Sequence, residues 1–441
     1  MEIQKRVCLL FLAWILLLCG CTPGPGSQTT APTTSEPTVP AVTEPAVMET
    51  TVPAATEPTV PETTVPVVEP TAELICEGVR VLVDGGDYTV ALSDDDHYSK
   101  KYLFPDQKLE VTSQTPFAAL YIVWDAIPGS YELRWEGGSV TAGEYGFLHE
   151  YIRLPEETNH VEFVFPEDTR QLTLCDVEVL TAGKAPEGIQ DWLPPCEQAD
   201  ILVFPTHSDD DVLFFGPLIA YYAIETDYTV QTAFMVDHAF YPERGHERLN
   251  GLWAMGVRHY PILGSATDSA ITDFYQALDF YWGSNIEQWQ VEQIRRVRPL
   301  VVVGHDLKGE YGNGGHKVNA HFLKTAVEAA ADPECYPELA ERYGVWQPAK
   351  LYLHLYEENE ILLDVQTPLS RDPLGRSPFE IAAEAFKAHV SQSQYGFRVQ
   401  FGESRMFDCR PFGLYFTLVG PDTKADIMEN IDAALWRENN R

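Results

Sequence analysis

The chain has 441 residues, of which 66 are Asp or Glu and 30 are Lys or Arg, giving a formal net charge of −36. A charge of this size and sign argues against nucleic acid and bare anionic lipid as partners, because both are polyanions. A neutral glycan is therefore a better-matched substrate than a polyanionic one, although the three arginines at 295–298 would offset the repulsion locally.

The first residues are typical of an export signal. Lys5 and Arg6 precede an apolar run at 7–18, which is too short for a stable transmembrane helix but suits the core of a signal peptide. The run ends in Leu-Cys-Gly-Cys, which resembles a bacterial lipobox with Cys21 as the lipidated residue. We therefore expect residues 1–21 to direct export and Cys21 to carry a lipid that anchors the protein at the cell surface. An ordinary, cleaved secretion signal is the alternative.

The next segment, 22–73, consists mainly of Thr, Pro, Glu, Val and Ala, with repeats such as TEPTVP. No Lys or Arg occurs between Arg6 and Arg80. Such a segment has few large apolar groups to bury, and its prolines favour extended geometry. We predict a semi-rigid, negatively charged stalk.

Residues 75–184 contain short alternating runs separated by Gly, Pro, Asp and Asn turns. This spacing predicts a small all-β sandwich, and its last run, LTLCDVEVL, resembles the final strand of discoidin-type, galactose-binding-like modules. Such modules often bind glycans, so Trp124, Trp135 and Tyr145 are candidates for stacking against sugars. A place in the aromatic core is the favoured interpretation of these residues. The three aspartates at 94–96 could bind a cation, but such a run is more typical of a solvated turn.

Five cysteines follow Cys21, and none forms a close pair of the kind that holds structural zinc. Cys76 and Cys175 lie in the first and last predicted strands of the sandwich. A disulfide between them is compatible with export, and so are two free thiols. The odd total leaves at least one thiol free.

Residues 186–441 alternate between strand and helix patterns. The predicted strands are 199–205, 228–236, 259–264, 299–305 and 350–356, and the predicted helices are 211–223, 243–256, 286–298, 316–330 and 377–392. This alternation predicts a Rossmann-like α/β fold, with a largely parallel sheet and helices on both faces. A segment of roughly 250 residues is long enough for one large core.

The first of these strands ends in His207-Ser208-Asp209-Asp210-Asp211. Open α/β folds bind their ligands at the carboxyl ends of strands, so these polar residues mark a candidate site. Ser208 and Asp211 also fit a helix-capping signal. Capping explains neither His207 nor the neighbouring Asp209 and Asp210, whose mutual repulsion is costly unless a cation is present.

A second strand, 299–305, leads through a glycine-rich loop to His316 at the start of an amphipathic helix. Zinc in hydrolytic enzymes is commonly held by three His, Asp or Glu ligands with a fourth position open to water. His207, Asp210 and His316 supply such a set, and Fe²⁺ could occupy the same site. Asp209 lies beside a ligand without needing to be one, so it could accept the proton of a water at the metal.

Four motifs, in order, resemble those of the PIG-L family of N-acetylglucosaminyl de-N-acetylases, which are zinc enzymes. They are HSDDD at 207–211, RGHE at 244–247 followed by LNGLWAMGV, GEYGNGGH at 309–316 and AFKAHVSQSQ at 385–394. The match runs from Ala199 to about Gly420.

The resemblance implies roles for particular residues. It assigns zinc binding to His207, Asp210 and His316, and it makes Asp209 the general base. It further implies that Arg244 contacts the substrate and that Tyr311 polarises the amide carbonyl.

The sequence departs from the family pattern at three positions. Ser208 replaces a proline, and Asp211 replaces a glutamate whose role we take to be structural. Asn313 stands where most relatives have a histidine near the developing oxyanion. An Asn amide still donates a hydrogen bond to an oxyanion but has no proton to deliver, so the general acid is left open. The glycines of 309–315 let backbone approach a ligand closely, and no Gly-Lys-Ser/Thr follows, so they do not form a phosphate loop.

Several residues near these motifs have purely structural interpretations. Arg244 and Glu247 are spaced as a surface ion pair on a helix would be. His305 and His246 are better explained as structural or supporting residues than as ligands. His389, in an amphipathic helix, has the pattern of a partly buried structural histidine.

We therefore expect an exported, surface-anchored zinc amidohydrolase that removes acetate from an N-acetylhexosamine-containing glycan or glycoconjugate and leaves a free amine. A glycan-binding lipoprotein with a degenerate hydrolase domain is the main alternative. A zinc amidase acting on a non-sugar N-acyl substrate is the second. The three ligand residues together with Asp209 favour an active enzyme, and nothing in the sequence indicates an oligomeric state.

Overall fold

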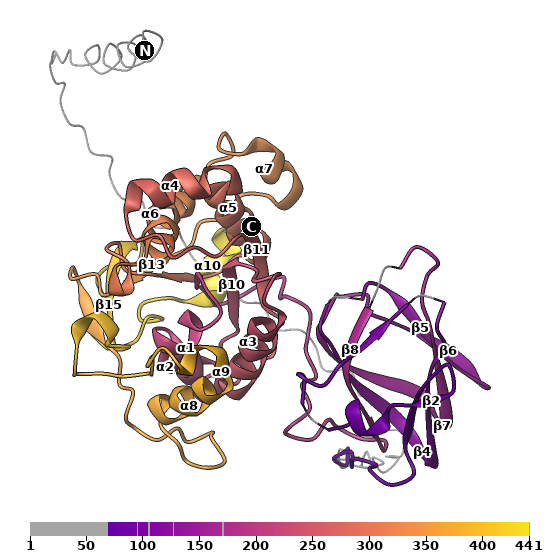
Figure 1. Cartoon of the computed structure of the whole chain (residues 1–441). Helices are drawn as coiled ribbons and strands as arrows, with labels where there is room; N and C mark the ends of the chain where they lie inside the picture. Colours follow the sequence, from indigo (N-terminus) through magenta and orange to yellow (C-terminus); the bar gives the residue numbers. More distant parts are fainter. Residues whose placement is uncertain (1–68, 95, 105, 127, 170–171, 441) are drawn as a thin grey trace, which may run out of the picture. The chain divides into compact units, whose positions relative to one another are not determined.

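The computed structural model is shown in Figure 1. It describes residues 69–94, 96–104, 106–126, 128–169 and 172–440, all within one compact unit. The expected signal peptide and almost all of the expected stalk lie outside these residues, as does one of the three consecutive aspartates. None of the helices in the described part of the chain combines the length and the apolar composition needed to cross a bilayer.

An eight-stranded antiparallel sheet comes first in the described chain. Its strands are β1 (Arg80–Val83), β2 (Gly86–Asp87), β3 (Lys101–Leu103), β4 (Leu109–Trp124), β5 (Tyr131–Trp135), β6 (Gly138–Ala142), β7 (His149–Val164) and β8 (Leu172–Leu180). The order is β2-β1-β4-β7-β5-β6, with β8 pairing both β3 and β4. The register of β4 against β7 shifts between Thr112 and Phe117, and β4 pairs β1 before this irregularity and β8 after it. Such an irregularity bends a strand, so one long strand serves both pairings.

The tryptophans of this sheet belong to its core. Trp124 is fully buried and packs edge-on against Tyr131 and Phe163, with ring centroids 5.6 and 6.4 Å apart. Trp135 is also buried, and its Nε1 donates to Glu156 Oε1 at 2.7 Å. The core interpretation is therefore confirmed for both tryptophans, and neither ring is available to stack against a sugar. Tyr145, by contrast, is exposed.

The second sheet has seven strands in the order β11-β10-β9-β12-β13-β15-β14. Its strands are β9 (Ile201–Val203), β10 (Val230–Val236), β11 (Ile262–Ala266), β12 (Val301–Gly304), β13 (Lys350–His354), β14 (Glu360–Leu362) and β15 (Pro411–Thr417). The pairings from β11 to β13 are parallel, whereas β15 and β14 are antiparallel. The predicted α/β class is confirmed. The sheet is mixed rather than largely parallel throughout, because β14 and β15 pair antiparallel, and the sequence did not predict these two strands.

The α-helices of the described residues all follow β8 in the chain, as the strands of this second sheet do. They are α1 (Asp210–Leu213), α2 (Gly216–Ala220), α3 (Pro242–Ala254), α4 (Phe274–Tyr281), α5 (Ile286–Val297), α6 (Gly314–Ala329), α7 (Pro337–Tyr343), α8 (Pro378–Ala385), α9 (Val390–Ser393) and α10 (Ala433–Asn439). In Figure 1, α4, α5 and α6 lie on one side of the sheet, and α1, α2, α3 and α8 lie on the other.

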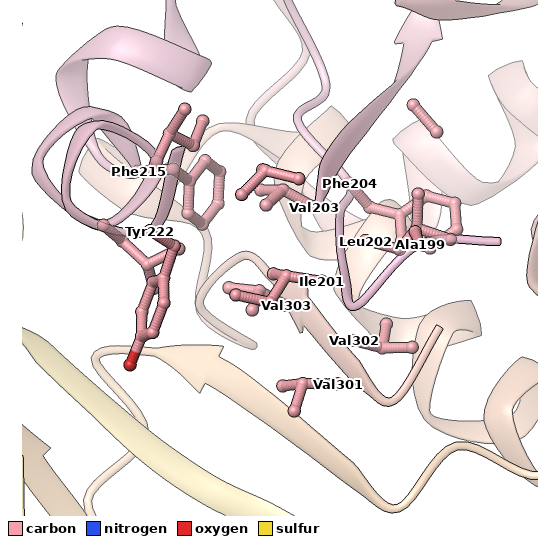
Figure 2. Close-up of a cluster of buried hydrophobic side chains, with 14 of the residues drawn as sticks. Ala199, Ile201, Leu202, Val203, Phe204, Phe215, Tyr222, Val301, Val302 and Val303 are labelled. Carbon is pink, nitrogen blue, oxygen red and sulfur yellow. The ribbon is translucent and has the colours of Figure 1, made fainter. Parts of the chain in front are cut away.

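The central strands are apolar throughout because both of their faces are covered. Ile201, Leu202 and Val203 of β9 are fully buried, and they pair in parallel register with 301–303 of β12. Figure 2 shows these side chains in one cluster with Phe215 and other large residues. A continuous apolar run of this kind is typical of a buried parallel strand.

Two predicted helices are interrupted. The helix expected at 211–223 is divided into α1, α2 and a π-helical turn, η2 (Tyr221–Glu225). Pro217 lies at the start of α2, and a proline inside a continuous helix would lose a hydrogen bond and clash with the preceding turn. The helix expected at 377–392 is divided by a short 3₁₀ turn at 386–388.

Contacts join the antiparallel sheet to α3 and its neighbours. The backbone N–H of Leu148 donates to Tyr260 Oη at 3.1 Å, and the Phe147 ring stacks on Tyr260 at 4.4 Å. His149 Nε2 lies 2.8 Å from His246 Nδ1 of α3. His246 is therefore a buried contact residue, which agrees with its structural interpretation.

The proposed disulfide is absent, because Cys76 and Cys175 are both free. Cys76 is exposed and precedes β1, whereas Cys175 is buried within β8. The ligand-type atoms of Cys175, Asp125 and His246 lie within 4.8 Å of one another. Cys175 thus lies in the interior beside Asp125 and His246, whereas Cys76 lies at the surface.

Candidate functional site

The candidate site lies where β9 and β12 end. These strands are neighbours in the sheet, so the loops that follow them meet although they are about a hundred residues apart in sequence. His207 and Asp210 come from the loop and first helical turn after β9. His316 comes from the first turn of α6, after β12.

The three predicted ligands form a nearly equilateral triangle. His207 Nδ1 is 3.2 Å from Asp210 Oδ2 and 3.1 Å from His316 Nε2. His316 Nε2 is 3.1 Å from Asp210 Oδ2. All three side chains are buried. Metal ligands at about 2.0–2.2 Å from a common ion are separated by distances of this order.

Glu310 orients the imidazole of His316. Its Oε2 is 2.8 Å from His316 Nδ1, so that nitrogen donates and leaves the Nε2 lone pair facing the triangle. The same carboxylate accepts from His305 Nδ1 and from His354 Nδ1, each at 2.8 Å. Burial acts to raise the pKa of Glu310, but the neighbouring His305 and the hydrogen bonds from the three histidines hold it well below its usual value. Glu310 is thus an ionised supporting residue, of the kind that fixes the tautomer of a metal-binding histidine.

His305 is part of this support. Its Nε2 accepts a hydrogen bond from the backbone N–H of Thr206 at 2.9 Å, and its Nδ1 is used by Glu310. Both nitrogens therefore have protein partners. The interpretation of His305 as structural agrees with these contacts, although its ligand-type atoms lie within 4.8 Å of those of Glu310 and His316.

Asp268 lies beside the far nitrogen of His207. Its Oδ1 is 3.2 Å from His207 Nε2, and its Oδ2 is 3.4 Å from His238 Nε2. Burial acts to raise the pKa of Asp268, while the two histidines lower it, and the result is a strongly depressed pKa. Asp268 follows the end of β11, so the strand-end argument that located His207 would also have located it.

Two observations indicate that the triangle could hold a divalent metal ion. First, Asp210 Oδ1 is buried and has no hydrogen-bond partner among the described residues. Second, two imidazole nitrogens and a carboxylate oxygen point at one another, which is unfavourable for the nitrogen lone pairs unless a proton or a cation lies between them. Two histidines and a carboxylate suit zinc or Fe²⁺. The residues therefore form a candidate metal centre.

Asp209 lies at the N-terminus of α1, next to the triangle. Arg244 Nη2 donates to its Oδ1 at 2.8 Å and to the Ser208 carbonyl oxygen at 3.1 Å. Burial, together with the neighbouring Asp210 carboxylate, raises the pKa of Asp209 to about 6, although Arg244 acts to lower it. A carboxylate with a pKa near the working pH is suited to accept and return a proton.

Arg244 and Glu247 do not form the surface ion pair considered from the sequence. Arg244 pairs with Asp209, and Glu247 is buried. The Glu247 carboxylate accepts from the backbone N–H and the hydroxyl of Ser391, each at 2.6 Å. These bonds tie α3 to α9 and so position Arg244 over the site.

The capping interpretation of Ser208 and Asp211 is wrong. Helix α1 begins after Asp209, and no side chain caps it. Ser208 Oγ instead accepts from Arg248 Nη1 at 2.8 Å and lies 2.9 Å from His238 Nδ1. Asp211 is buried, and burial followed by the Asp209 charge raises its pKa well above the usual value.

The loop before α6 places Tyr311 and Asn313 at the site. Tyr311 has φ 43°, a left-handed conformation that is strained for a tyrosine and is typical of functional loops. Gly309 has φ 69°, and a Cβ there would lie 2.3 Å from the Asn313 carbonyl oxygen. Asn313 Oδ1 accepts from the backbone N–H of His316 at 3.2 Å, which caps α6. The side-chain oxygen of Asn313 is thus engaged, and its amide NH₂ is the group left to donate.

These residues line a cleft of about 560 Å³. The volume is within the range of small-molecule sites. Its lining includes four residues assigned chemical or substrate roles from the sequence, namely Asp209, Arg244, Tyr311 and Asn313, together with His207. Ser391, Gln392 and Gln394 of the fourth motif also line it. The remaining lining residues were not named from the sequence, and they are Tyr241, Glu243, Asp268, Ser269, Ala270, Tyr395 and Phe397.

His389 lies behind the cleft and is not among its lining residues. It is fully buried, and its ring stacks on Phe386 at 5.7 Å. Burial, followed by the nearby Arg244 charge, lowers the pKa of His389 to about 3. It is therefore a neutral packing residue, more deeply buried than expected.

Comparison with known proteins finds relatives that match part of this chain. No protein-family model matches the chain. The chain is 27% identical over 213 residues to 1D-myo-inositol 2-acetamido-2-deoxy-alpha-D-glucopyranoside deacetylase 1 of Catenulispora acidiphila, covering 42% of this chain and 65% of that protein. It is 30% identical over 176 residues to the protein of that name from Frankia alni, covering 33% and 59%. It is 28% identical over 212 residues to the deacetylase of Streptomyces scabiei, covering 42% and 64%.

The chain thus spans less than two thirds of the length of these relatives. All three are named as deacetylases of an acetamido sugar, which supports an enzyme of the hydrolase class. Among solved structures, conserved protein TT1542 of Thermus thermophilus superposes with a TM-score of 0.32 and 17% identity, covering 44% of this chain and 80% of that one. GalB, the 4-carboxy-2-hydroxymuconate hydratase of Pseudomonas putida, superposes with a TM-score of 0.34 and 14% identity, covering 51% and 100%. Neither superposition defines the fold of this chain.

Proposed function

We propose that this protein is a metal-dependent deacetylase that hydrolyses the acetamide of an N-acetylhexosamine within a glycan or glycoconjugate. The products are acetate and a free amine. The observation that carries the proposal is the triangle of His207 Nδ1, Asp210 Oδ2 and His316 Nε2, with Asp209 beside it. Zinc is the proposed ion and Fe²⁺ the alternative. The similarity to named deacetylases supports the reaction, and the Rossmann-like PIG-L type is the proposed family.

The residues around the triangle suit each step of amide hydrolysis. A divalent metal held there would act as a Lewis acid on the acetamide carbonyl and lower the pKa of a nearby water. Asp209 would accept a proton from the attacking water while the water oxygen forms a bond to the carbonyl carbon. Arg244 holds the Asp209 carboxylate in place.

The negative charge that develops on the carbonyl oxygen needs donors. The Tyr311 hydroxyl and the Asn313 amide both line the cleft and could donate to it. Burial, followed by the Asp210 and Asp209 charges, raises the pKa of Tyr311, so its hydroxyl keeps its proton. Asn313 has no proton to transfer. The proton taken up by Asp209 is therefore the one available to the amine nitrogen when the C–N bond breaks.

The cellular setting is a second part of the proposal. A lipid on Cys21, followed by a stalk at 22–73, would hold the enzyme at the surface of a bacterial cell. Replacing Cys21 with Ala should prevent incorporation of a labelled fatty acid and release the protein from the membrane fraction. Unchanged labelling would contradict this anchor.

Two alternatives make different predictions. A degenerate glycan-binding protein would bind N-acetyl sugars without releasing acetate, and Asn313 is the substitution that suggests it. A metal amidase for non-sugar substrates would release acetate from simple N-acetylated amines or peptides but not from sugars.

The decisive experiment measures acetate release by the purified protein, with and without a chelator, followed by restoration of the metal. The substrates would be N-acetylglucosamine, N-acetylgalactosamine, chitooligosaccharides, peptidoglycan fragments and N-acetylated amino acids. Chelator-sensitive release from an N-acetyl sugar is expected. Release from the amino acids alone, or no release from any substrate by the metal-loaded protein, would overturn the proposal.

A further inference from the structure

Two exposed tyrosines stand at the cleft. Tyr241 is 56% exposed and directly precedes α3, which carries Arg244. Tyr395 is 68% exposed and lies just after α9, which carries Ser391. Both line the cleft that contains Asp209. An aromatic side chain exposed to solvent does not gain the free energy that burial would give it. Two such side chains beside the candidate site therefore suggest a binding role.

Neither tyrosine side chain belongs to a hydrophobic core cluster in the described part of the chain. Neither ring is in contact with another aromatic ring, and neither hydroxyl has a hydrogen-bond partner there. Their backbones, in contrast, are held in place. The Tyr241 N–H donates to the His238 carbonyl oxygen at 2.8 Å, and its own carbonyl accepts from the Arg244 N–H at 2.9 Å. The Tyr395 N–H donates to the Gln392 carbonyl oxygen at 3.1 Å.

The rest of the lining shows what kind of ligand these rings would meet. It offers the neutral side chains of Gln392, Gln394 and Ser269 beside the carboxylates of Glu243 and Asp268, and groups of both kinds form hydrogen bonds with hydroxyls. Arg244 is the one Lys or Arg side chain among the lining residues, and Asp209 already neutralises it. Since no free positive charge from the described residues lines the cleft, it suits an uncharged ligand better than a phosphorylated or carboxylated one.

We infer that the cleft binds a neutral oligosaccharide, with sugars next to the hydrolysed unit stacked on Tyr241 and Tyr395. The inference rests on the proposed function and specifies its substrate class. A pyranose ring presents apolar C–H groups on its faces and hydroxyls at its edge. The faces pack on an aromatic ring, and the hydroxyls reach neutral polar side chains. A cleft of about 560 Å³ also extends beyond what one sugar ring fills.

The test measures binding separately from hydrolysis. In metal-loaded Asp209→Asn protein, which keeps bound sugars intact, titration calorimetry would compare N-acetylglucosamine with its β-1,4-linked dimer and tetramer. The tetramer should bind about tenfold more tightly than the monomer. Tyr241→Ala and Tyr395→Ala, each added to this protein, should remove about threefold of that gain while leaving monomer affinity unchanged.

Tyr275→Ala is the matched control, because Tyr275 is 77% exposed on α4 and is not among the residues lining the cleft. It should leave the affinity for every oligomer unchanged. Equal affinity for monomer and tetramer would overturn the inference, and so would Tyr241→Ala and Tyr395→Ala variants that bind the tetramer as the parent protein does. If the oligomers bind as expected but the protein with Asp209 intact releases no acetate from them, the proposed activity fails and the oligosaccharide site stands.

Discussion

Two clusters of His, Asp and Cys side chains occupy different electrostatic surroundings. One is the triangle of His207, Asp210 and His316 at the strand ends. The other joins Asp125 and Cys175 of the antiparallel sheet region to His246 of α3. In each, the ligand-type atoms lie within 4.8 Å of one another. By spacing alone, both are candidate metal sites.

The charges next to each cluster distinguish them. Lys100 Nζ lies 3.0 Å from Asp125 Oδ2, so that carboxylate already has a cation. Burial acts to raise the pKa of Asp125, and the neighbouring His246 together with the Lys100 ammonium group brings it below its usual value. Beside the triangle, Arg244 forms an ion pair with Asp209. The Asp210 carboxylate, in contrast, has imidazoles rather than Lys or Arg as its neighbours. A carboxylate that already has a cation gains less from a metal, so donor spacing by itself does not define a metal site.

The largest expected effect comes from removing one ligand in each cluster. His316→Ala should lose the metal and reduce turnover to background, because two protein ligands remain. Cys175→Ser should keep both metal and activity. Elemental analysis of the purified proteins, with acetate release measured in parallel, gives the comparison. Metal that persists in His316→Ala but disappears from Cys175→Ser would move the site to the second cluster.

The next effect separates metal binding from proton transfer. Asp209→Asn should keep the metal but lower turnover by about 10²–10⁴-fold, because the amide does not accept the proton of the attacking water. Asp211→Asn is the matched control. Asp211 belongs to the same turn but is buried and does not line the cleft, so its replacement should change turnover little. Comparable losses in the two variants would point to disruption of α1 rather than to loss of a base.

A smaller effect is expected at Asn313, whose oxygen caps α6. Asn313→Ser keeps a capping oxygen but removes the amide donor, so turnover should fall by about 10²–10³-fold while the melting temperature changes little. Initial rates and thermal unfolding measure the two roles. If Asn313→Ser is as active as the parent protein, capping is the residue's whole role. If the parent is inactive and Asn313→His gains activity, the degenerate interpretation is correct.

The smallest effect is expected at Glu310, which accepts a hydrogen bond from the ligand His316. Glu310→Gln should weaken metal affinity by about 10–100-fold, because the neutral amide no longer holds His316 in its metal-binding orientation. With metal in excess, turnover should recover to near the parent value. Competition against a chelator of known affinity measures the change. An unaltered affinity would show that packing around His316, rather than the Glu310 carboxylate, orients the ring.

Much of this architecture follows from local sequence. The apolar runs at 199–205 and 299–305 overlap β9 and β12, because a strand covered on both faces needs an uninterrupted apolar run. The residues that follow each run must lie at the same edge of a parallel sheet. For this reason the convergence of His207, Asp210 and His316 is predictable from the sequence alone.

Other features depend on the tertiary structure. Three features leave no distinct periodic signal in the sequence. They are the antiparallel strands β14 and β15, the cap that Asn313 provides for α6, and the role of Glu310 as partner to three histidines. Arg244 could have paired with Glu247 on its own helix, but the packing of α3 brings it to Asp209 and brings Glu247 to Ser391. Helical spacing determines which side chains share a face. Which partner each one meets depends on the elements that the folded chain places opposite that face, and that is decided by contacts between residues far apart in sequence.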